Sequence, residues 1–233
     1  FDLPPTNNAI GLTVPDTGTG GATNGSAVIQ GTTKAAAAIP SFDGTQLVLP
    51  AYGGNSAATN GYVDMPNYMI SPLASSNGGP GQLSLELWVN VTAAATWCEL
   101  VYLGNCVNGE ITGPGTASTG GANGILIPAQ ISGNAEQSGF RSTGVGNWTI
   151  SARFIGSRKH IVVTWDEASD LVKIYHEGIQ VGQFVVTGKM NTVNDVNNWL
   201  GRSGWNDADC AANYREFRIY NRVLSAAEVR RNY

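Results

Sequence analysis

Residues 83–89 read Leu-Ser-Leu-Glu-Leu-Trp-Val, an alternation in which the odd-numbered side chains are all aliphatic. Successive side chains of a β-strand point to opposite faces, so this period of two predicts a strand with one face buried and one mostly exposed. Similar alternation returns at residues 159–165 and 214–220. Strands of this kind must bury their apolar face against another layer, and they therefore decide the fold class.

Short strands separated by turn residues follow one another along the chain from Phe42 onward. Gly178 takes a positive φ at little cost and predicts a tight hairpin between two of them. Ser225 and Glu228 form a capping box, which predicts one short helix reaching about Asn232. With no helices alternating with the strands, the pattern predicts an all-β, antiparallel β-sandwich or jelly roll with a short C-terminal helix. The predicted strands cover residues 26–30, 46–49, 61–65, 83–89, 99–103, 125–131, 148–155, 159–165, 171–175, 179–186 and 214–220.

The composition indicates a folded protein outside the cell. The chain has 233 residues, of which 42% are hydrophobic and only 13% charged, against roughly 25% charged in typical domains. Disorder requires high charge and low hydrophobicity, so it is excluded, and a neutral polar surface is common in extracellular proteins. We find no membrane span. The chain opens at Phe1 without a visible signal peptide, which suggests that an export signal was removed.

Charge is divided unevenly along the chain. Residues 1–140 carry 8 acidic and 1 basic side chains, whereas residues 141–233 carry 9 acidic and 12 basic ones. Two interpretations stay open: the two faces of one sandwich differ in charge, or the division steers head-to-tail contacts between copies. Since there is no run of Lys or Arg, no nucleic-acid partner is expected.

The N-terminal segment, residues 1–40, differs from the rest. It is rich in Gly, Thr and Asn, and only residues 26–30 resemble a strand. The segment could be a linker, an edge strand that wraps the domain, or an arm that pairs with a neighbouring subunit. We therefore predict an N-terminal arm or linker over residues 1–40 and a sandwich domain over residues 41–233.

The chain has three cysteines, Cys98, Cys106 and Cys210. An odd number is not a disulfide framework. One bridge is slightly favoured, and the pair stays open. A local bridge between Cys98 and Cys106 would leave Cys210 as a thiol or as a link between chains. The alternative is that all three cysteines are reduced.

Several motifs resemble laminin G-like domains of the concanavalin A-like lectin/glucanase superfamily. Residues 61–66 and 83–89 resemble the opening strands, and residues 160–178 resemble the central hairpin, with Glu177-Gly178 where Asp-Gly is usual. Residues 200–203 and 216–228 resemble the closing strand and its helix. The resemblance covers residues 42–233 and implies two packed antiparallel sheets, an extracellular setting and the binding of glycans or proteins. It does not identify a ligand.

Catalytic patterns are missing from the sequence. Glycoside hydrolysis requires two carboxylates about 5–9 Å apart across the sugar, but Glu86 stands alone on its strand and Asp166-Glu167 would point to opposite faces. Arg215, Glu216 and Arg218 suggest a polysaccharide lyase only superficially, because their surroundings fit the closing strand better. His160 and His176 have no nucleophile elbow nearby and are interpreted as structural or surface residues. We therefore expect no enzyme.

A calcium ion is a possible cofactor, since domains of the resembled family often carry one and Ca²⁺ prefers loop carboxylates and carbonyls. The alternative for the acidic loop near residue 207 is a solvated turn. The candidate metal ligands are Asp43, Asp64, Asp207 and Asp209.

The candidate ligand-binding residues are Trp205, Asn206 and Asp207, with Arg202 as a further donor, because an exposed tryptophan among polar loop residues suits a sugar ring. Weaker candidates are Trp97, Trp148 and Tyr52. Each tryptophan could instead pack in the core or at its rim; Trp165 is expected in the core, and Trp199 is undecided.

The favoured function is thus a non-catalytic extracellular module that binds a glycan or an extracellular protein. The first alternative is a self-assembling filament or surface-layer subunit, a homo-polymer in which residues 1–40 add a strand to the next copy. The second alternative, a glycan-active enzyme, lacks its carboxylates.

Overall fold

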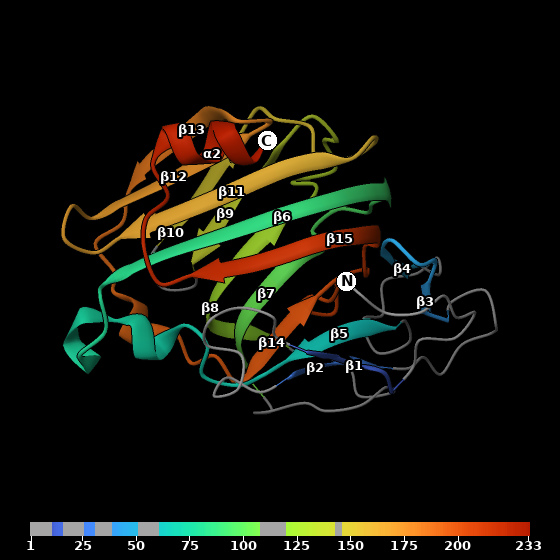
Figure 1. Ribbon diagram of the computed structural model, residues 1–233, viewed down its shortest axis with the longest axis horizontal. Helices are drawn as coiled ribbons and strands as arrows, with labels where there is room; N and C mark the ends of the chain where they lie inside the picture. Colours follow the sequence, from blue (N-terminus) through green and yellow to red (C-terminus); the bar gives the residue numbers. More distant parts are fainter. Residues whose placement is uncertain (1–10, 16–25, 31–38, 51–60, 108–119, 143–145) are drawn as a thin grey trace.

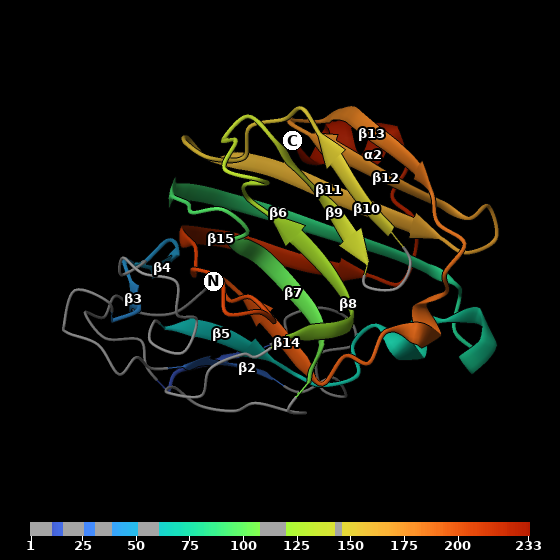
Figure 2. The same ribbon diagram turned by 180° about the vertical axis from the view of Figure 1, so that it is seen from behind.

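Two antiparallel sheets lie face to face in this computed structural model, which describes residues 11–15, 26–30, 39–50, 61–107, 120–142 and 146–233 (Figures 1 and 2). The front sheet, which faces the viewer in Figure 1, has the order β13 (Ile179–Val185), β12 (Leu171–His176), β11 (Lys159–Asp166), β6 (Gln82–Ala93), β15 (Ala211–Tyr220), β4 (Leu47–Leu49) and β3 (Ser41–Phe42). The back sheet has the order β1 (Thr13–Pro15), β2 (Ser26–Gln30), β5 (Tyr62–Met65), β14 (Asn197–Leu200), β7 (Glu99–Cys106), β8 (Gly121–Pro128), β9 (Ser138–Ser142) and β10 (Gly146–Ile150). The predicted all-β antiparallel sandwich is confirmed.

The main core lies between the sheets and is built from alternate residues of the strands. The leucines of β6 are buried in it, together with Ile161, Val163 and Trp165 of β11. β6 pairs with β11 on one side and with β15 on the other. The intervening side chains, among them Glu86 and Trp88, therefore point to the outer face of the front sheet.

Helix α2 (Ala226–Asn232) covers part of that outer face, as Figure 1 shows. Leu224 and Val229 form a small second core with Val162 and Tyr175. The predicted capping box is present, because the Ser225 hydroxyl accepts a hydrogen bond from the Glu228 backbone N–H at 3.3 Å and the Glu228 carboxylate accepts one from the Ser225 N–H at 2.8 Å. The helix thus begins where the sequence predicts.

The described strands within residues 1–40, β1 and β2, belong to the back sheet. β2 pairs with β5, and β1 pairs with β2 at the edge of the sheet. Residues 1–10, 16–25 and 31–38 lie outside the described residues. The division at residue 40 and the addition of a strand to another copy stay predictions.

Strand β14 was not predicted from the sequence. All four of its residues, including Trp199, are buried, and it pairs with β5 and β7. Two asparagines in a four-residue segment hide the apolar pattern that identifies a strand. Three short 3₁₀ turns, Ser71–Leu73, Ser75–Asn77 and Met190–Thr192, were not predicted either. No helix among the described residues meets the length and hydropathy that a membrane crossing demands.

One disulfide joins the two sheets. It links Cys98, just before β7, to Cys210, just before β15, with a Cα–Cα distance of 5.2 Å. The local pairing of Cys98 with Cys106 is not formed; the Cys106 thiol is buried and donates to the Gly204 carbonyl at 3.6 Å. A separation of 112 residues between the bridged cysteines explains why spacing could not reveal the pair.

Candidate functional site

An open pocket of about 260 Å³ lies on the outer face of the front sheet, beside α2. Strands β6 and β15, the segment before β11 and the end of α2 supply its walls. Its lining residues are Trp88, Arg158, Arg215, Glu216, Arg218 and Asn232. A half-buried aromatic ring, three guanidinium groups and an amide are therefore brought together from parts of the chain far apart in sequence.

A β-bulge in β15 shapes this pocket. Tyr214 pairs with Val89 and Glu216 with Trp88, so Arg215 is an extra residue opposite β6. A bulge bends its strand and changes the direction of the side chains at that point. Arg215 and Glu216, which are neighbours in sequence, consequently both line the pocket.

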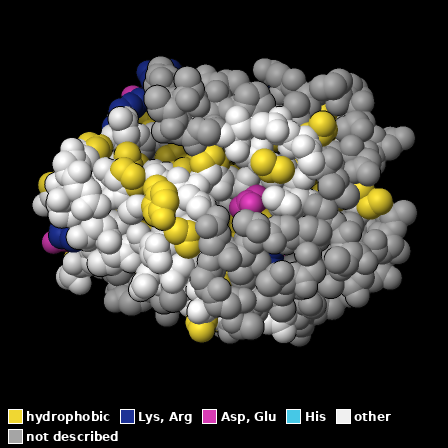
Figure 3. Space-filling model, turned by 90° about the horizontal axis from the view of Figure 1, so that it is seen from below, with side chains coloured by type: hydrophobic (Ala, Val, Ile, Leu, Met, Phe, Trp, Pro, Cys, Tyr) yellow, Lys and Arg dark blue, Asp and Glu magenta, His cyan; other side chains and the backbone are white. Residues whose placement is uncertain are grey.

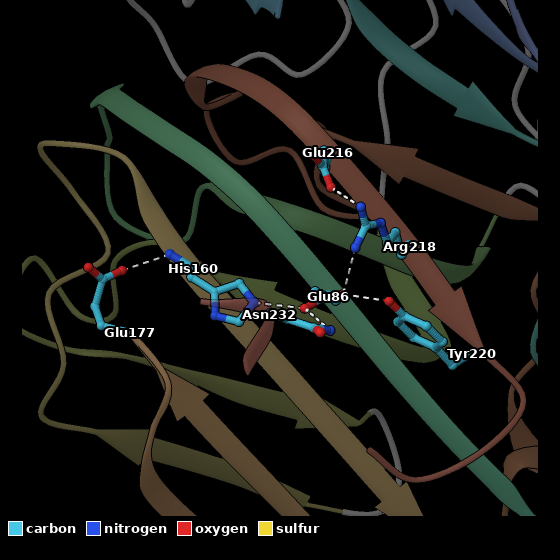
Figure 4. A network of polar contacts seen from close by, with 7 residues as sticks. All are labelled: Glu86, His160, Glu177, Glu216, Arg218, Tyr220 and Asn232. Atoms are coloured by element: carbon cyan, nitrogen blue, oxygen red, sulfur yellow. Dashed lines mark hydrogen bonds and ion pairs between the residues drawn. The ribbon is translucent and has the colours of Figure 1, made fainter. Parts of the chain in front are cut away.

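Glu86, whose partners Arg218 and Asn232 line the pocket, is at the centre of a hydrogen-bond network (Figure 4). Its side chain is only 1% exposed. One carboxylate oxygen accepts hydrogen bonds from His160 Nε2 at 2.8 Å and Asn232 Nδ2 at 3.0 Å. The other accepts one from the Tyr220 hydroxyl at 2.6 Å and lies 3.5 Å from a guanidinium nitrogen of Arg218. The network fixes the pocket wall to β6, β11 and α2.

The same network sets the ionisation of Glu86. Burial raises its pKa, but the hydrogen bonds from His160, Tyr220 and Asn232 together outweigh burial and lower the pKa to about 2. Glu86 is therefore a carboxylate at neutral pH. The general acid of a glycosidase has the opposite property, a raised pKa.

Aromatic rings hold Trp88 in place. Its ring stacks on His160, with centroids 4.6 Å apart, and lies nearly parallel to Tyr233 at 6.1 Å. Since His160 also donates to Glu86, the orientation of Trp88 is coupled to the buried network. The Trp88 side of the pocket is thus already ordered, which lowers the entropy cost of binding there.

The predicted ligand-binding loop lies on the other side of the sandwich. Arg202 is fully buried, with its guanidinium 4.3 Å from the Trp199 ring centre and 4.6 Å from that of Tyr62. Trp205 is half-buried and meets the ring of Tyr102 edge-on. These aromatic residues form a cluster separate from the main core. Arg202 therefore supports the loop from inside and has no surface to offer a ligand.

Asn206 and Asp207 remain at the surface of that loop. Asn206 is exposed, whereas Asp207 is half-buried, with one carboxylate oxygen 3.4 Å from the Ser203 hydroxyl. Burial raises the pKa of Asp207. Figure 3 shows the molecule from below the view of Figure 1. Hydrophobic side chains form an interrupted band on this face, and an acidic side chain lies beside the band.

The predicted metal ligands have other partners. Asp43 is exposed and accepts hydrogen bonds from Thr45 and Gln46 in its own turn, which lower its pKa to about 2. Asp64 accepts from Gln30 at 3.2 Å and from the Trp199 indole at 3.2 Å. Asp207 and the buried Asp209 belong to the loop before β15. Within the described ranges, no three His, Cys, Asp or Glu side chains are grouped to hold a metal ion, and calcium stays a prediction.

The weaker aromatic candidates Trp97 and Trp148 are likewise not among the residues that line the pocket at Trp88. Trp148 stacks with Phe140 and packs against the main core, and Trp165 is in that core as expected. The backbone φ of Trp97 is 63°, in the left-handed region that non-glycine residues seldom adopt. Tyr52 lies outside the described residues.

Sequence reasoning missed the pocket because its residues carry no joint signal. Trp88 reads as the outer residue of one strand, and Arg158 is half of an Arg-Lys pair. Arg215, Glu216 and Arg218 are predicted in the closing strand and lie there, in β15. Only the pairing of β15 with β6 brings this run to Trp88.

A family model, described as the concanavalin A-like lectin/glucanases superfamily, matches residues 58–230. No curated protein matches the chain in sequence. Similar solved structures include domain 4 of AbnA, a GH43 extracellular arabinanase from Geobacillus stearothermophilus, in complex with arabinotriose, at TM-score 0.61 and 18% identity over 89% of this chain and 87% of that one.

A second similar structure is the CBM40 of the Ruminococcus gnavus IT-sialidase bound to α2,3-sialyllactose. It has a TM-score of 0.52 and 15% identity, over 65% of this chain and 81% of that one. A Trypanosoma rangeli sialidase mutant that displays trans-sialidase activity has a TM-score of 0.53 and 14% identity, over 88% of this chain but only 28% of that one. At identities of 14–18%, these similarities show a shared fold and nothing further.

Proposed function

Since the chain belongs to the concanavalin A-like lectin/glucanase superfamily, we propose that it is a non-catalytic, extracellular carbohydrate-binding module. We assign its ligand to the open pocket at Trp88. The observation that carries this assignment is that a half-buried tryptophan lies in one pocket with guanidinium and amide donors. Apolar sugar faces stack on aromatic rings while such donors bind the hydroxyl groups.

Two of the similar structures support a glycan as the ligand. The arabinanase domain is in complex with arabinotriose, and the CBM40 is bound to sialyllactose. The Cys98–Cys210 disulfide supports an extracellular setting, because such bonds persist in oxidising compartments.

The carboxylates of the pocket support binding without catalysis. Glu86 is ionised, buried and occupied by hydrogen bonds, so it has no proton to give to a leaving group. Glu216 forms an ion pair with Arg218. The lowered pKa of Glu86 is the opposite of the raised pKa that a general acid requires.

Paired tryptophan variants on a glycan array test the proposal. Trp88→Ala should abolish binding, whereas Trp205→Ala, which alters a half-buried tryptophan in the loop before β15, should leave binding unchanged. Circular dichroism and thermal melts of both variants show whether the fold is kept. Loss of binding in Trp205→Ala alone would move the site to the loop predicted from the sequence. A wild-type protein that binds no glycan, or that cleaves one, would contradict the proposed function.

A further inference from the structure

The side chains that β6 directs away from the main core become more exposed along the strand. Ser84 and Glu86 are buried, Trp88 and Asn90 are half-buried, and Thr92 is exposed. Alternate residues of a strand share a face, so the first four of these residues form one row on the outer face of the front sheet. The row is therefore closed at one end and open at the other, with Trp88 between the two ends.

The C-terminal part of the chain closes the row at Ser84 and Glu86. The Ser84 hydroxyl donates to the Arg222 carbonyl at 2.7 Å and accepts from the Leu224 N–H at 2.9 Å. Asn232, at the end of α2, donates to the Glu86 carboxylate (Figure 4). A sugar chain bound in the pocket therefore cannot continue along β6 in this direction.

Two asparagines lie at the open end of the row. Asn90 of β6 is directly opposite Asn213 of β15 in the register of the two strands. Such opposite residues share a face, with Cβ atoms about 4.5–5.5 Å apart. Asn213 is also half-buried, and no hydrogen bond joins either side-chain amide to another of the described residues. Both amides are therefore available to a ligand.

The surface at the two asparagines continues from the pocket. Trp88 and Asn90 are two residues apart, which is about 6.8 Å along an antiparallel strand. On the other side of β6, the Gly156 N–H donates to the Val91 carbonyl at 2.9 Å, and Arg158, two residues further on, lines the pocket. A second sugar unit, joined to one that is stacked on Trp88, therefore reaches the asparagines along the direction of β6.

Building on the proposed function, we infer that the binding site extends from the pocket over Asn90 and Asn213 and takes a chain of at least two sugar units. One unit stacks on Trp88, and the next lies on the two amides. Each amide has an acceptor oxygen and two N–H donors. Because sugar hydroxyl groups both donate and accept hydrogen bonds, the pair of amides matches a further sugar unit.

Isothermal titration calorimetry with sugars of one, two and three units tests this extension. The probes are arabinose, galactose, glucose and xylose, each together with its own di- and trisaccharide. In a series that binds, we expect the wild type to bind the two-unit sugar at least about tenfold more tightly than the one-unit sugar, since two amides add hydrogen bonds to the second unit.

Asn90→Ala and Asn213→Ala should each weaken binding of the two-unit sugar about threefold, and the double variant should weaken it about tenfold. Affinity for the one-unit sugar should stay unchanged, because neither asparagine lines the pocket. Asn206→Ala is the matched control, since it removes an exposed amide from the loop before β15 and should change neither affinity. Thermal melts check that the variants fold.

The outcomes separate the inference from the proposed function. Equal affinities of the wild type for one and two units would overturn the inference and leave a carbohydrate-binding module. A double variant that keeps the gain from the second unit, or that loses the one-unit sugar equally, would also overturn it, as would an equal loss in Asn206→Ala. Binding of none of these sugars would overturn the inference, and an empty glycan array as well would overturn the proposed function.

Discussion

Glu86 occupies a position that the sequence marks as exposed, yet it is buried. The alternating strand predicts the face correctly, because Glu86 does point away from the main core. α2 then closes over that face and brings Asn232 to the carboxylate. A buried charge persists only where donors compensate its lost hydration, and four side chains surround this one.

Glu86→Gln is expected to lower the free energy of unfolding at pH 7 by about 3 kcal/mol. The folded-state pKa of about 2 lies below the ordinary 4.5, so the carboxylate's stabilisation is complete above 4.5 and is lost as pH falls towards 2. The difference between wild type and variant should therefore shrink over that range. Urea unfolding at several pH values measures it.

The matched control is Glu136→Gln, which breaks the surface ion pair with Arg153. Glu136 is 65% exposed, and such pairs contribute less than about 1 kcal/mol. A Glu86→Gln variant as stable as this control would mean that the network in Figure 4 contributes little.

Asp207 should respond in the opposite direction. Burial raises its pKa, so the fold favours the protonated form and loses stability as pH rises from the ordinary value of 3.8 through the raised folded value. Asp207→Asn replaces the carboxyl group with a neutral amide of the same shape. The variant should raise the melting temperature slightly at pH 7 and give no gain at acidic pH. If Asp207 instead binds calcium, the wild type will be stabilised by added calcium and destabilised by EDTA, and the variant will not respond.

At the scale of elements, two structural features shape the pocket: the capping box of α2 and the β-bulge at Arg215. Only the capping box can be recognised in the sequence. The capping box of α2 is a local pattern, since Ser225 and Glu228 contact each other directly. The bulge at Arg215 is not, because it exists only relative to the register of β6. Local hydrogen bonds can be read from spacing, whereas the register depends on which strand becomes the partner.

Ser225→Ala should lower the free energy of unfolding by about 1 kcal/mol, the usual cost of losing an N-cap. Because α2 ends at Asn232, which lines the pocket, the same variant is expected to bind its ligand somewhat more weakly. Thermal melts and calorimetry measure the two effects. Ser151→Ala, at an exposed serine, serves as the control, and an equal loss there would show that the cap is not the cause.

On the scale of the whole molecule, the Cys98–Cys210 disulfide joins the sheets across 112 residues. Closing so long a loop is expected to contribute about 4–5 kcal/mol in the chain-entropy model. Reductant should therefore lower the melting temperature of the wild type and of Cys106→Ala alike, and should have no effect on Cys98→Ala/Cys210→Ala. A non-reducing peptide map that shows a Cys98–Cys106 link would contradict the structure.

The sandwich also separates the candidate surfaces. The loop with Trp205 and Asp207 belongs to the aromatic cluster of the back sheet, whereas Trp88 opens on the front sheet. The predicted ligand-binding residues Arg202, Trp205, Asn206 and Asp207 are close in sequence and chemically suited to sugars. The structure shows that Arg202 turns inward from this group, because stacking on Tyr62 and Trp199 compensates its burial.

By itself, the sequence determined the fold class, most strands and the capped helix. Alternating burial in strands and the capping of a helix each depend on residues only a few positions apart. Tertiary structure alone decided the disulfide partner, the strand β14, the burial of Glu86 and the pocket around Trp88. Each of these depends on contacts between strands distant in the chain. Such contacts follow from which elements pair and in which register, and no local spacing records that choice.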